Sequence, residues 1–181
     1  MQTEGHHGEE YHYKTINTDA RGWIISRVSG MELTELLSER IWSRIGAEQD
    51  AYVTVDGKGT PFAGGGMSAG LRDLGRIGLL MLNEGEINGR LLFPSDVVAG
   101  IRKGSSKEDF EKAGYKTLKG GSYRGMWWLF HNKHGAFAAR GVHGQTIYVD
   151  PTADMVLVRF ASFPTAKNAK IDLTSLPAYQ A

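Results

Sequence analysis

The chain contains no cysteine, few prolines and no long hydrophobic run. The lack of cysteine excludes disulfide bonds, thiolate metal sites and a cysteine nucleophile. The most apolar stretches, residues 77–82 and 155–163, are far shorter than the roughly 20 residues of a membrane-spanning helix, so no membrane partner is expected. The first ten residues show neither a charged n-region nor an apolar h-region, so no signal peptide is predicted and the localisation stays open.

The net charge of the chain is also close to zero. The 21 Lys and Arg against 20 Asp and Glu leave +1, without the basic excess that binding a nucleic-acid backbone demands. The chain has 181 residues, of which 41% are apolar and 23% charged, as in an ordinary globular protein. We therefore expect one folded domain over residues 1–181 and no nucleic-acid partner.

Helical patterns dominate the first part of the chain. Asn17 or Thr18 can cap a helix over residues 19–29, in which apolar residues recur with a 3.6-residue period and which Gly30 ends. Four further helices are predicted, at about residues 33–41, 70–83, from 95 onward and 106–113. Between them, residues 51–55 alternate like a strand and lead into an Asp56-Gly57 turn.

Strand patterns dominate the second part. We predict four strands, at residues 123–130, 136–140, 146–149 and 155–161, joined as an antiparallel meander. Because helices come first and strands afterwards, the predicted fold class is α+β, an antiparallel sheet flanked by helices.

Two motifs that could bind a cofactor or a metal lack the necessary context. Gly64-Gly65-Gly66-Met67-Ser68-Ala69 matches G-x-G-x-x-A, but the flanking residues do not supply the two parallel strands of a dinucleotide-binding unit. His6, His7 and His12 cluster near the N-terminus without metal-binding spacing. We therefore expect neither a cofactor nor a metal.

Several aromatic and histidine residues are candidates for a binding site. Trp127 and Trp128 are consecutive on a predicted strand, so one ring faces the core and the other faces solvent or a pocket. His143 lies between two Gly-containing pairs and reads as a turn residue or a base. Tyr13 precedes Lys14, and a neighbouring cation can lower a phenol's pKa enough to make it a general base.

A resemblance joins these features into one pattern. It rests on Tyr13-Lys-Thr-Ile-Asn17-Thr-Asp19-Ala-Arg-Gly22-Trp, Leu71-Arg-Asp73, Trp127-Trp128 and Gly141-Val-His-Gly-Gln145-Thr-Ile-Tyr-Val-Asp-Pro151. In this order, over about residues 9–161, they resemble the serine β-lactamase-like hydrolases, in particular the branch of 6-aminohexanoate-dimer hydrolases and carboxylesterases. The resemblance implies a partial β-lactamase/transpeptidase-like fold and a small amide or ester as substrate.

The same resemblance implies roles for individual residues. Tyr13 would relay a proton from a serine to the leaving group, and the backbone N–H of Val142 would contribute to the oxyanion hole. Ser68, Trp127, Trp128 and Gly141 would contact the substrate. Two departures, Thr15 and Ala139, stand where many β-lactamases carry an asparagine and a cation, which disfavours lactam recognition.

The nucleophile of this family, the serine of a Ser-x-x-Lys pair, has no counterpart here. None of the twelve residues before Tyr13 is a serine, and these later serines do not have Lys three residues on: Ser26, Ser29, Ser38, Ser43, Ser68, Ser95 and Ser122. The chain therefore reads as the C-terminal part of such a hydrolase, partnered by a missing N-terminal half or by a second copy. The alternative is a non-catalytic binding or scaffold module.

Overall fold

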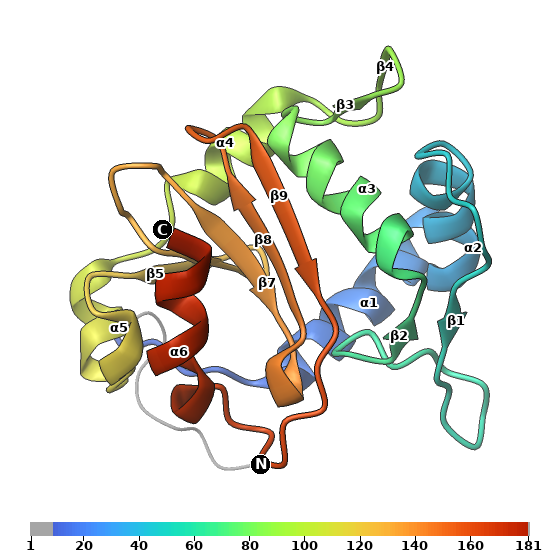
Figure 1. Cartoon of the computed structure of the whole chain (residues 1–181). Helices are drawn as coiled ribbons and strands as arrows, with labels where there is room; N and C mark the ends of the chain where they lie inside the picture. Colours follow the sequence, from blue (N-terminus) through green and yellow to red (C-terminus); the bar gives the residue numbers. More distant parts are fainter. Residues whose placement is uncertain (1–8, 181) are drawn as a thin grey trace.

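Five antiparallel strands form the central sheet in the computed structural model, which describes residues 9–180 (Figure 1). They pair in chain order, β5-β6-β7-β8-β9. Their bounds are Ser122–Arg124, Trp127–Leu129, Phe137–Arg140, Thr146–Asp150 and Met155–Arg159. The predicted meander and the α+β class are both confirmed.

One predicted strand, residues 123–130, is in fact the hairpin β5–β6. Gly125 and Met126 take φ of 57° and 72°, and Arg124 pairs with Trp127 across this two-residue turn. Two consecutive left-handed residues match the twist of the flanking strands and let the chain reverse at once. The prediction of a single strand was wrong because Met126 gives no turn signal in the sequence.

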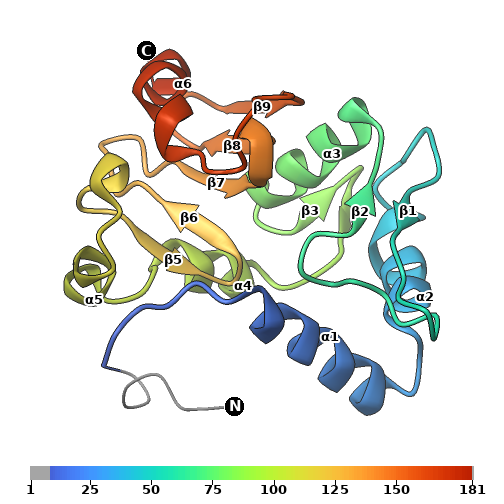
Figure 2. The same cartoon turned by 90° about the horizontal axis from the view of Figure 1, so that it is seen from below.

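Helices cover both faces of the sheet (Figure 2). On one face α3 (Leu71–Leu82) and α4 (Ser95–Arg102) supply Met81 and Val98 to a core shared with Trp127, Phe137 and Val149. On the other face, α5 (Lys107–Lys112) and α6 (Ala169–Gln180) supply Phe110 and Leu176 to a core around Trp128. None of the helices within residues 9–180 is long and apolar enough to cross a membrane.

Three of the helices agree with their predictions at nearly every boundary. α3 and α4 match the predicted starts at Gly70 and Ser95 within a residue, and the Ser106 side chain caps α5 by accepting from the Asp109 N–H at 3.2 Å. In contrast, α6 is missing from the predicted elements. Its sequence carries Pro177 inside the helix and shows no marked apolar stripe.

The first helix, α1 (Thr15–Ser29), begins four residues earlier than predicted. Lys14 stands at the N-cap, and the Asp19 side chain instead accepts a hydrogen bond from the Gly64 N–H at 2.9 Å. The predicted end is confirmed, because Gly30 takes φ of 69° and its N–H donates to the Ser26 carbonyl. The next predicted helix is divided into α2 (Leu33–Leu37) and a π-helical turn, Ser38–Trp42.

Two small antiparallel ladders lie apart from the main sheet. β1 (Tyr52–Val53) pairs with β2 (Met67–Ser68), and β3 (Glu86–Ile87) pairs with β4 (Arg90–Leu91). The second ladder turns through Asn88-Gly89, and both residues have left-handed backbone conformations. An Asn-Gly pair is a strong hairpin signal, but this hairpin was not among the predicted elements. Two short 3-10 turns, η2 (Lys116–Leu118) and η3 (Val142–Gly144), complete the described elements.

The glycine-rich loop approaches other backbone segments closely. A Cβ at Gly64 would lie 2.3 Å from the Thr15 methyl carbon, and a Cβ at Gly66 would lie 2.4 Å from the Thr54 hydroxyl oxygen. All strand pairs in residues 9–180 are antiparallel, so the βαβ unit that a dinucleotide site needs is not formed there. Gly64 allows the loop to pack against α1, and Gly66 allows it to pack against the residue after β1.

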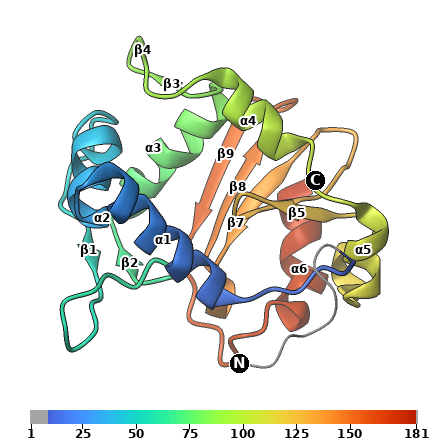
Figure 3. The ribbon, with the colours of Figure 1, turned by 180° about the vertical axis from the view of Figure 1, so that it is seen from behind.

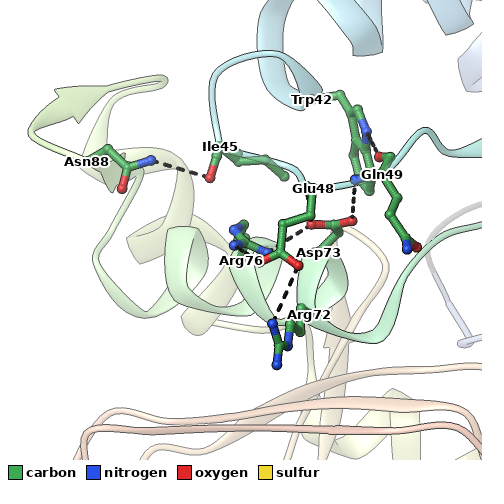
Figure 4. Close-up of polar contacts among 8 residues, drawn as sticks. All are labelled: Trp42, Ile45, Glu48, Gln49, Arg72, Asp73, Arg76 and Asn88. Atoms are coloured by element: carbon green, nitrogen blue, oxygen red, sulfur yellow. Dashed lines mark hydrogen bonds and ion pairs between the residues drawn. The ribbon is translucent and has the colours of Figure 1, made fainter.

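A buried carboxylate fastens α3 to the preceding loop (Figure 4). Asp73, which is 1% exposed, accepts the backbone N–H groups of Glu48 and Gln49 at 2.9 and 3.2 Å. Arg76 donates to Asp73 at 2.9 Å and also binds Glu48. The Leu71-Arg-Asp73 motif therefore has a structural role in this chain.

Candidate functional site

Tyr13 lies at the solvent edge of a group of aromatic rings. Its ring stacks on Trp128, with 5.7 Å between the centroids, and meets Tyr123 edge-on at 5.8 Å. The side chain is 46% exposed, so the phenol is supported by aromatic rings on one side and open to solvent on the other. A tyrosine placed in this way is held in position and still accessible to a reactant.

The remaining rings form what we call the aromatic cluster: Tyr11, Phe110, Tyr115, Tyr123 and Trp128. They come from the segment before α1, from α5 and the residues after it, and from the β5–β6 hairpin. Tyr123 lies directly opposite Trp128 in the ladder, which brings their ring centroids to 5.0 Å. The cluster thereby joins three segments that are far apart in the sequence. Together they support the inner side of the Tyr13 ring.

Burial raises the pKa of three phenols of the cluster above the ordinary value for tyrosine. It raises the pKa of Tyr123 to about 12, with the Tyr13 phenol raising it further and Arg21 opposing the shift. Burial likewise raises the pKa of Tyr115, and that of Tyr11 far above its ordinary value. The Tyr11 hydroxyl is buried without a hydrogen-bond partner among residues 9–180.

The turn η3 joins β7 to β8, and the candidate residues Gly141 and Val142 lie at its start. Gly141 is extended, its N–H donates to the Gln145 carbonyl, and its own carbonyl accepts from the Asn168 side chain at 2.9 Å. Val142 is 59% exposed, and its backbone N–H donates to no acceptor within residues 9–180. The N–H expected to contribute to an oxyanion hole is therefore available.

His143 is held as a turn residue. It takes φ of 59°, its N–H donates to the Ala166 carbonyl, and its Nδ1 lies 2.7 Å from the Phe163 carbonyl oxygen. Because backbone groups of the segment after β9 engage the residue, the turn interpretation is favoured over the catalytic base.

Arg140 connects Trp128 to the strand end that precedes Val142. Its guanidinium carbon lies 5.7 Å from the Trp128 ring centre, and the guanidinium pairs with the buried Asp172 carboxylate of α6. The Thr117 hydroxyl donates to the same carboxylate at 2.6 Å. Burial lowers the pKa of Arg140 and the charge of Asp172 opposes this change. Trp128 thus contacts both Tyr13 and Arg140, the residue that directly precedes Gly141 and Val142.

The other two substrate-contact candidates lie elsewhere. Trp127 is buried on the α3 and α4 side of the sheet, edge-on to Phe137 at 5.2 Å, as the alternation of side chains along β6 requires. Ser68 is exposed on β2, in the separate small ladder opposite Tyr52. The pair of tryptophans is thus divided between the two cores, and only Trp128 contacts Tyr13.

The histidine cluster is only partly described. His6 and His7 lie outside the described residues, while His12 is exposed with its Nε2 3.2 Å from a Glu10 carboxylate oxygen. Within residues 9–180 no group of three or more His, Asp or Glu side chains is arranged to hold a metal ion.

Sequence reasoning missed most of the aromatic cluster. Tyr115 and Tyr123 were not candidates, although Tyr123 would have been placed opposite Trp128 if the hairpin turn at Gly125-Met126 had been recognised. The Arg140–Asp172 pair had no local signal, because its members are separated by 32 residues. Such contacts follow from strand pairing and from the position of α6.

Comparison with known proteins gives sequence and structural relatives. The chain is 37% identical over 156 residues to the 6-aminohexanoate-dimer hydrolase of Paenarthrobacter ureafaciens, covering 86% of this chain and 40% of that protein. A Bacillus anthracis protein described as a 6-aminohexanoate-dimer hydrolase superposes with a TM-score of 0.86 at 35% identity, covering 99% of this chain and 45% of its own. No family model matches the chain.

More distant solved structures show the fold alone. A β-lactamase from Mycobacterium bovis superposes with a TM-score of 0.68 at 19% identity, over 96% of this chain and 66% of its own. The chain spans less than half of the length of both hydrolases above. It has a β-lactamase/transpeptidase-like fold, and in sequence and structure it corresponds to the C-terminal portion of 6-aminohexanoate-dimer hydrolases.

Proposed function

We propose that this chain supplies the tyrosine and oxyanion side of a serine hydrolase site that acts on small amides or esters through an acyl-enzyme. The nucleophilic serine and its lysine would come from a Ser-x-x-Lys segment outside these 181 residues. One observation carries the proposal: a half-exposed Tyr13 stacks on Trp128, whose ring also contacts Arg140, two residues before the exposed Val142. The names of the two relatives support a hydrolase.

Each residue of the site has a stated part in this chemistry. Tyr13, acting as the phenolate, would take the proton of the attacking serine, and the phenol so formed would give that proton to the leaving amine or alcohol. The Val142 N–H would donate to the oxyanion of the tetrahedral intermediate. Trp128 and Gly141 would border the substrate, and Ser68 would reach it only if the substrate extends toward β2. Trp127, which packs in the core, has no part in the proposal.

The test is hydrolysis of nitrophenyl esters. We expect no activity above background from the chain alone, and activity once the N-terminal portion of a relative is joined to it. In the active form Tyr13→Phe should lower kcat by roughly 100-fold or more, as expected for loss of a general acid–base group. Tyr52→Phe, at an exposed tyrosine on β1, is the matched control and should leave kcat unchanged.

A second candidate, a non-catalytic binding module, is favoured by the lack of a Ser-x-x-Lys pair around the serines examined in this sequence. In that case Tyr13→Phe would leave ligand affinity unchanged, and no hydrolysis would appear after the N-terminal portion is joined. Isothermal titration with a small amide together with the ester assay separates the two functions.

A further inference from the structure

A cavity of about 340 Å³ lies on the α4 side of the sheet. It is bordered by the end of α4, which Figure 3 shows in yellow-green between β3 and α5, and by the turn from β6 to β7. Leu129 lines this cavity and belongs to the core of Trp127, whereas Trp128 belongs to the core on the other face. The cavity is therefore distinct from the candidate site around Tyr13.

The polar side chains that line the cavity are cations or hydrogen-bond donors. They are Arg102, Lys103 and His131, and no acidic side chain of residues 9–180 lines it. One terminal nitrogen of Arg102 lies 3.4 Å from a Glu84 carboxylate oxygen, and the other lies 3.3 Å from the place that a Cβ would take at Gly135. Lys103 has no ion pair among the described residues. The positive charge beside the cavity is thus only partly neutralised.

A hydrogen-bond network sets the proton position on His131. Its Nε2 lies 2.7 Å from the Oγ of Ser122, which is 0% exposed and also accepts the Ser105 N–H at 3.3 Å. A buried hydroxyl hydrogen needs an acceptor, so the Ser122 hydroxyl donates to Nε2. The neutral ring then carries its proton on Nδ1, which has no partner within residues 9–180. Burial lowers the pKa of His131, and the charge of Lys107 lowers it further, so both favour the neutral ring.

The end of α4 explains only part of this arrangement. Cations near a helix C-terminus interact favourably with its last carbonyls, which accounts for Arg102 and Lys103 by themselves. It does not account for His131 or for the cavity. Gly104, the second residue after α4, takes φ of 71°, and a Cβ there would collide with the Ser122 Oγ and lie 3.1 Å from the His131 Nε2. The end of α4 is therefore packed directly against the His131–Ser122 pair.

The rest of the lining is mostly apolar. Leu129 and Ala136, which are 4% and 1% exposed, contribute to it together with Ala99. A carboxylate can accept hydrogen bonds from a guanidinium, an ammonium and an imidazole N–H at once, and a short apolar chain can cover the remaining surface. An inorganic phosphate ion would use the donors without the apolar surface, and an alkylammonium would use the apolar surface without the donors.

We propose that this cavity binds a small organic carboxylate with a short apolar chain, held by Arg102, Lys103 and the Nδ1–H of His131. The apolar chain would lie against Leu129 and Ala136. The proposal goes beyond the proposed function and does not depend on it, because the cavity and the candidate site lie on different faces of the sheet.

The experiment is a titration of the whole isotope-labelled chain with sodium hexanoate, followed by NMR. We expect the amide resonances of residues 99–104 and 129–136 to shift in a saturable manner, with a dissociation constant of about 1 mM or below for a ligand of this size. Hexylamine has the same chain and the opposite charge, and should bind at least about 10-fold more weakly. Inorganic phosphate, which has no apolar chain, should also bind more weakly than hexanoate.

Charge variants test which side chains hold the carboxylate. Arg102→Gln with Lys103→Gln should weaken hexanoate binding by at least about 10-fold, because two charge-assisted contacts are lost. Glu84→Gln removes the acidic partner of Arg102 and should strengthen binding by about 2-fold. Lys170→Gln, at an exposed lysine of α6, is the matched control and should leave the affinity unchanged. Circular dichroism melting of each variant verifies that it is folded.

His131→Gln gives a separate measurement. The glutamine keeps an acceptor for the Ser122 hydroxyl but removes the ring, and it should weaken hexanoate binding by about 3-fold or more.

Several results would overturn the proposal. They are the lack of a saturable shift with hexanoate, an unchanged affinity after Arg102→Gln with Lys103→Gln, and hexylamine binding as tight as hexanoate. Phosphate binding tighter than hexanoate would overturn the assignment to an organic carboxylate. Shifts confined to residues around Trp128 and Val142 would place hexanoate in the candidate site and overturn the proposal as well.

Discussion

Helices α3 and α1 have comparable lengths and opposite packing. α3 buries Leu80 and Met81 against the sheet, and its Gly78 allows contact so close that a Cβ would lie 2.4 Å from a Val156 methyl carbon. α1 buries Gly22 and leaves its large apolar side chains in solvent. The apolar side chains of α3 gather on one side of the helix and cover a face of the sheet, whereas those of α1 are spread around the helix and stay exposed.

This difference divides the molecule into two regions. The sheet with α3, α4, α5 and α6 has a core on each face, whereas the exposed apolar side chains of α1 add little to the stability of the chain as it stands. Substitutions should therefore be costly in the first region and nearly neutral on α1. The following predictions test this contrast in order of decreasing effect.

The largest effect is expected at the Arg140–Asp172 pair, which joins β7 to α6 with both side chains buried. Arg140→Ala should lower the free energy of unfolding by about 3 to 5 kcal/mol, because it leaves a buried carboxylate without its partner. Urea denaturation followed by circular dichroism measures the loss. Arg140→Met with Asp172→Leu removes both charges and should recover much of it, and no recovery would contradict this explanation.

The core position Leu80 gives the most direct comparison with α1. Leu80→Ala should cost about 3 kcal/mol, since it removes a side chain that is 2% exposed and leaves a cavity. Ile24→Ala on α1 should change stability by less than about 0.5 kcal/mol. Thermal or urea unfolding of both variants suffices, and equal losses would show that α1 is packed in solution.

The Asp73 cluster should contribute an intermediate amount. Asp73→Ala removes the acceptor of two backbone N–H groups and of Arg76, and should cost about 2 kcal/mol. Glu35→Ala, at an exposed acidic residue of α2, is the control and should be neutral. If residues 46–49 exchanged their amide hydrogens no faster in Asp73→Ala, the proposed role of the carboxylate would be wrong.

The smallest effect concerns pH. Because the pKa of Tyr123 rises from 10 to about 12 on folding, the unfolded chain loses this proton first, so stability is retained below pH 10 and falls between pH 10 and 12. The slope should be at most about 1 kcal/mol per pH unit, reduced by the phenol's partial exposure. Tyr123→Phe should flatten it, as measured by urea midpoints across this range, and an unchanged slope would assign it to other groups.

Much of the fold could be predicted because its signals are local. The apolar period of α3, the Ser106 cap of α5 and the Gly30 end of α1 each depend on a few neighbouring residues. The hairpin at Gly125-Met126 and helix α6 were missed, since Met126 is not a turn residue by type and Pro177 disfavours a helix. In these two places tertiary contacts outweigh local preference.

For the site, the motif order selected Tyr13, Gly141 and Val142 as candidates, and the relatives confirmed the resemblance to the 6-aminohexanoate-dimer hydrolases. Their roles stay predictions. The sequence did not indicate which tryptophan contacts Tyr13, because the face of each ring depends on the register of β6 against β5 and β7. The sequence also did not indicate that Tyr123 and Arg140 contact Trp128, because these contacts depend on strand pairing as well.

The sequence by itself determined the succession of helices and then strands, the meander and the family pattern, since these depend on periodicity, turn residues and motif spacing. Only the tertiary structure decided that Trp128 supports Tyr13 while Trp127 belongs to the core, and that α1 faces outward. The physical reason is that the burial of a side chain depends on which distant surface is there to cover it. For α1, residues 9–180 provide a surface that covers Gly22 and leave the large apolar side chains of the helix exposed.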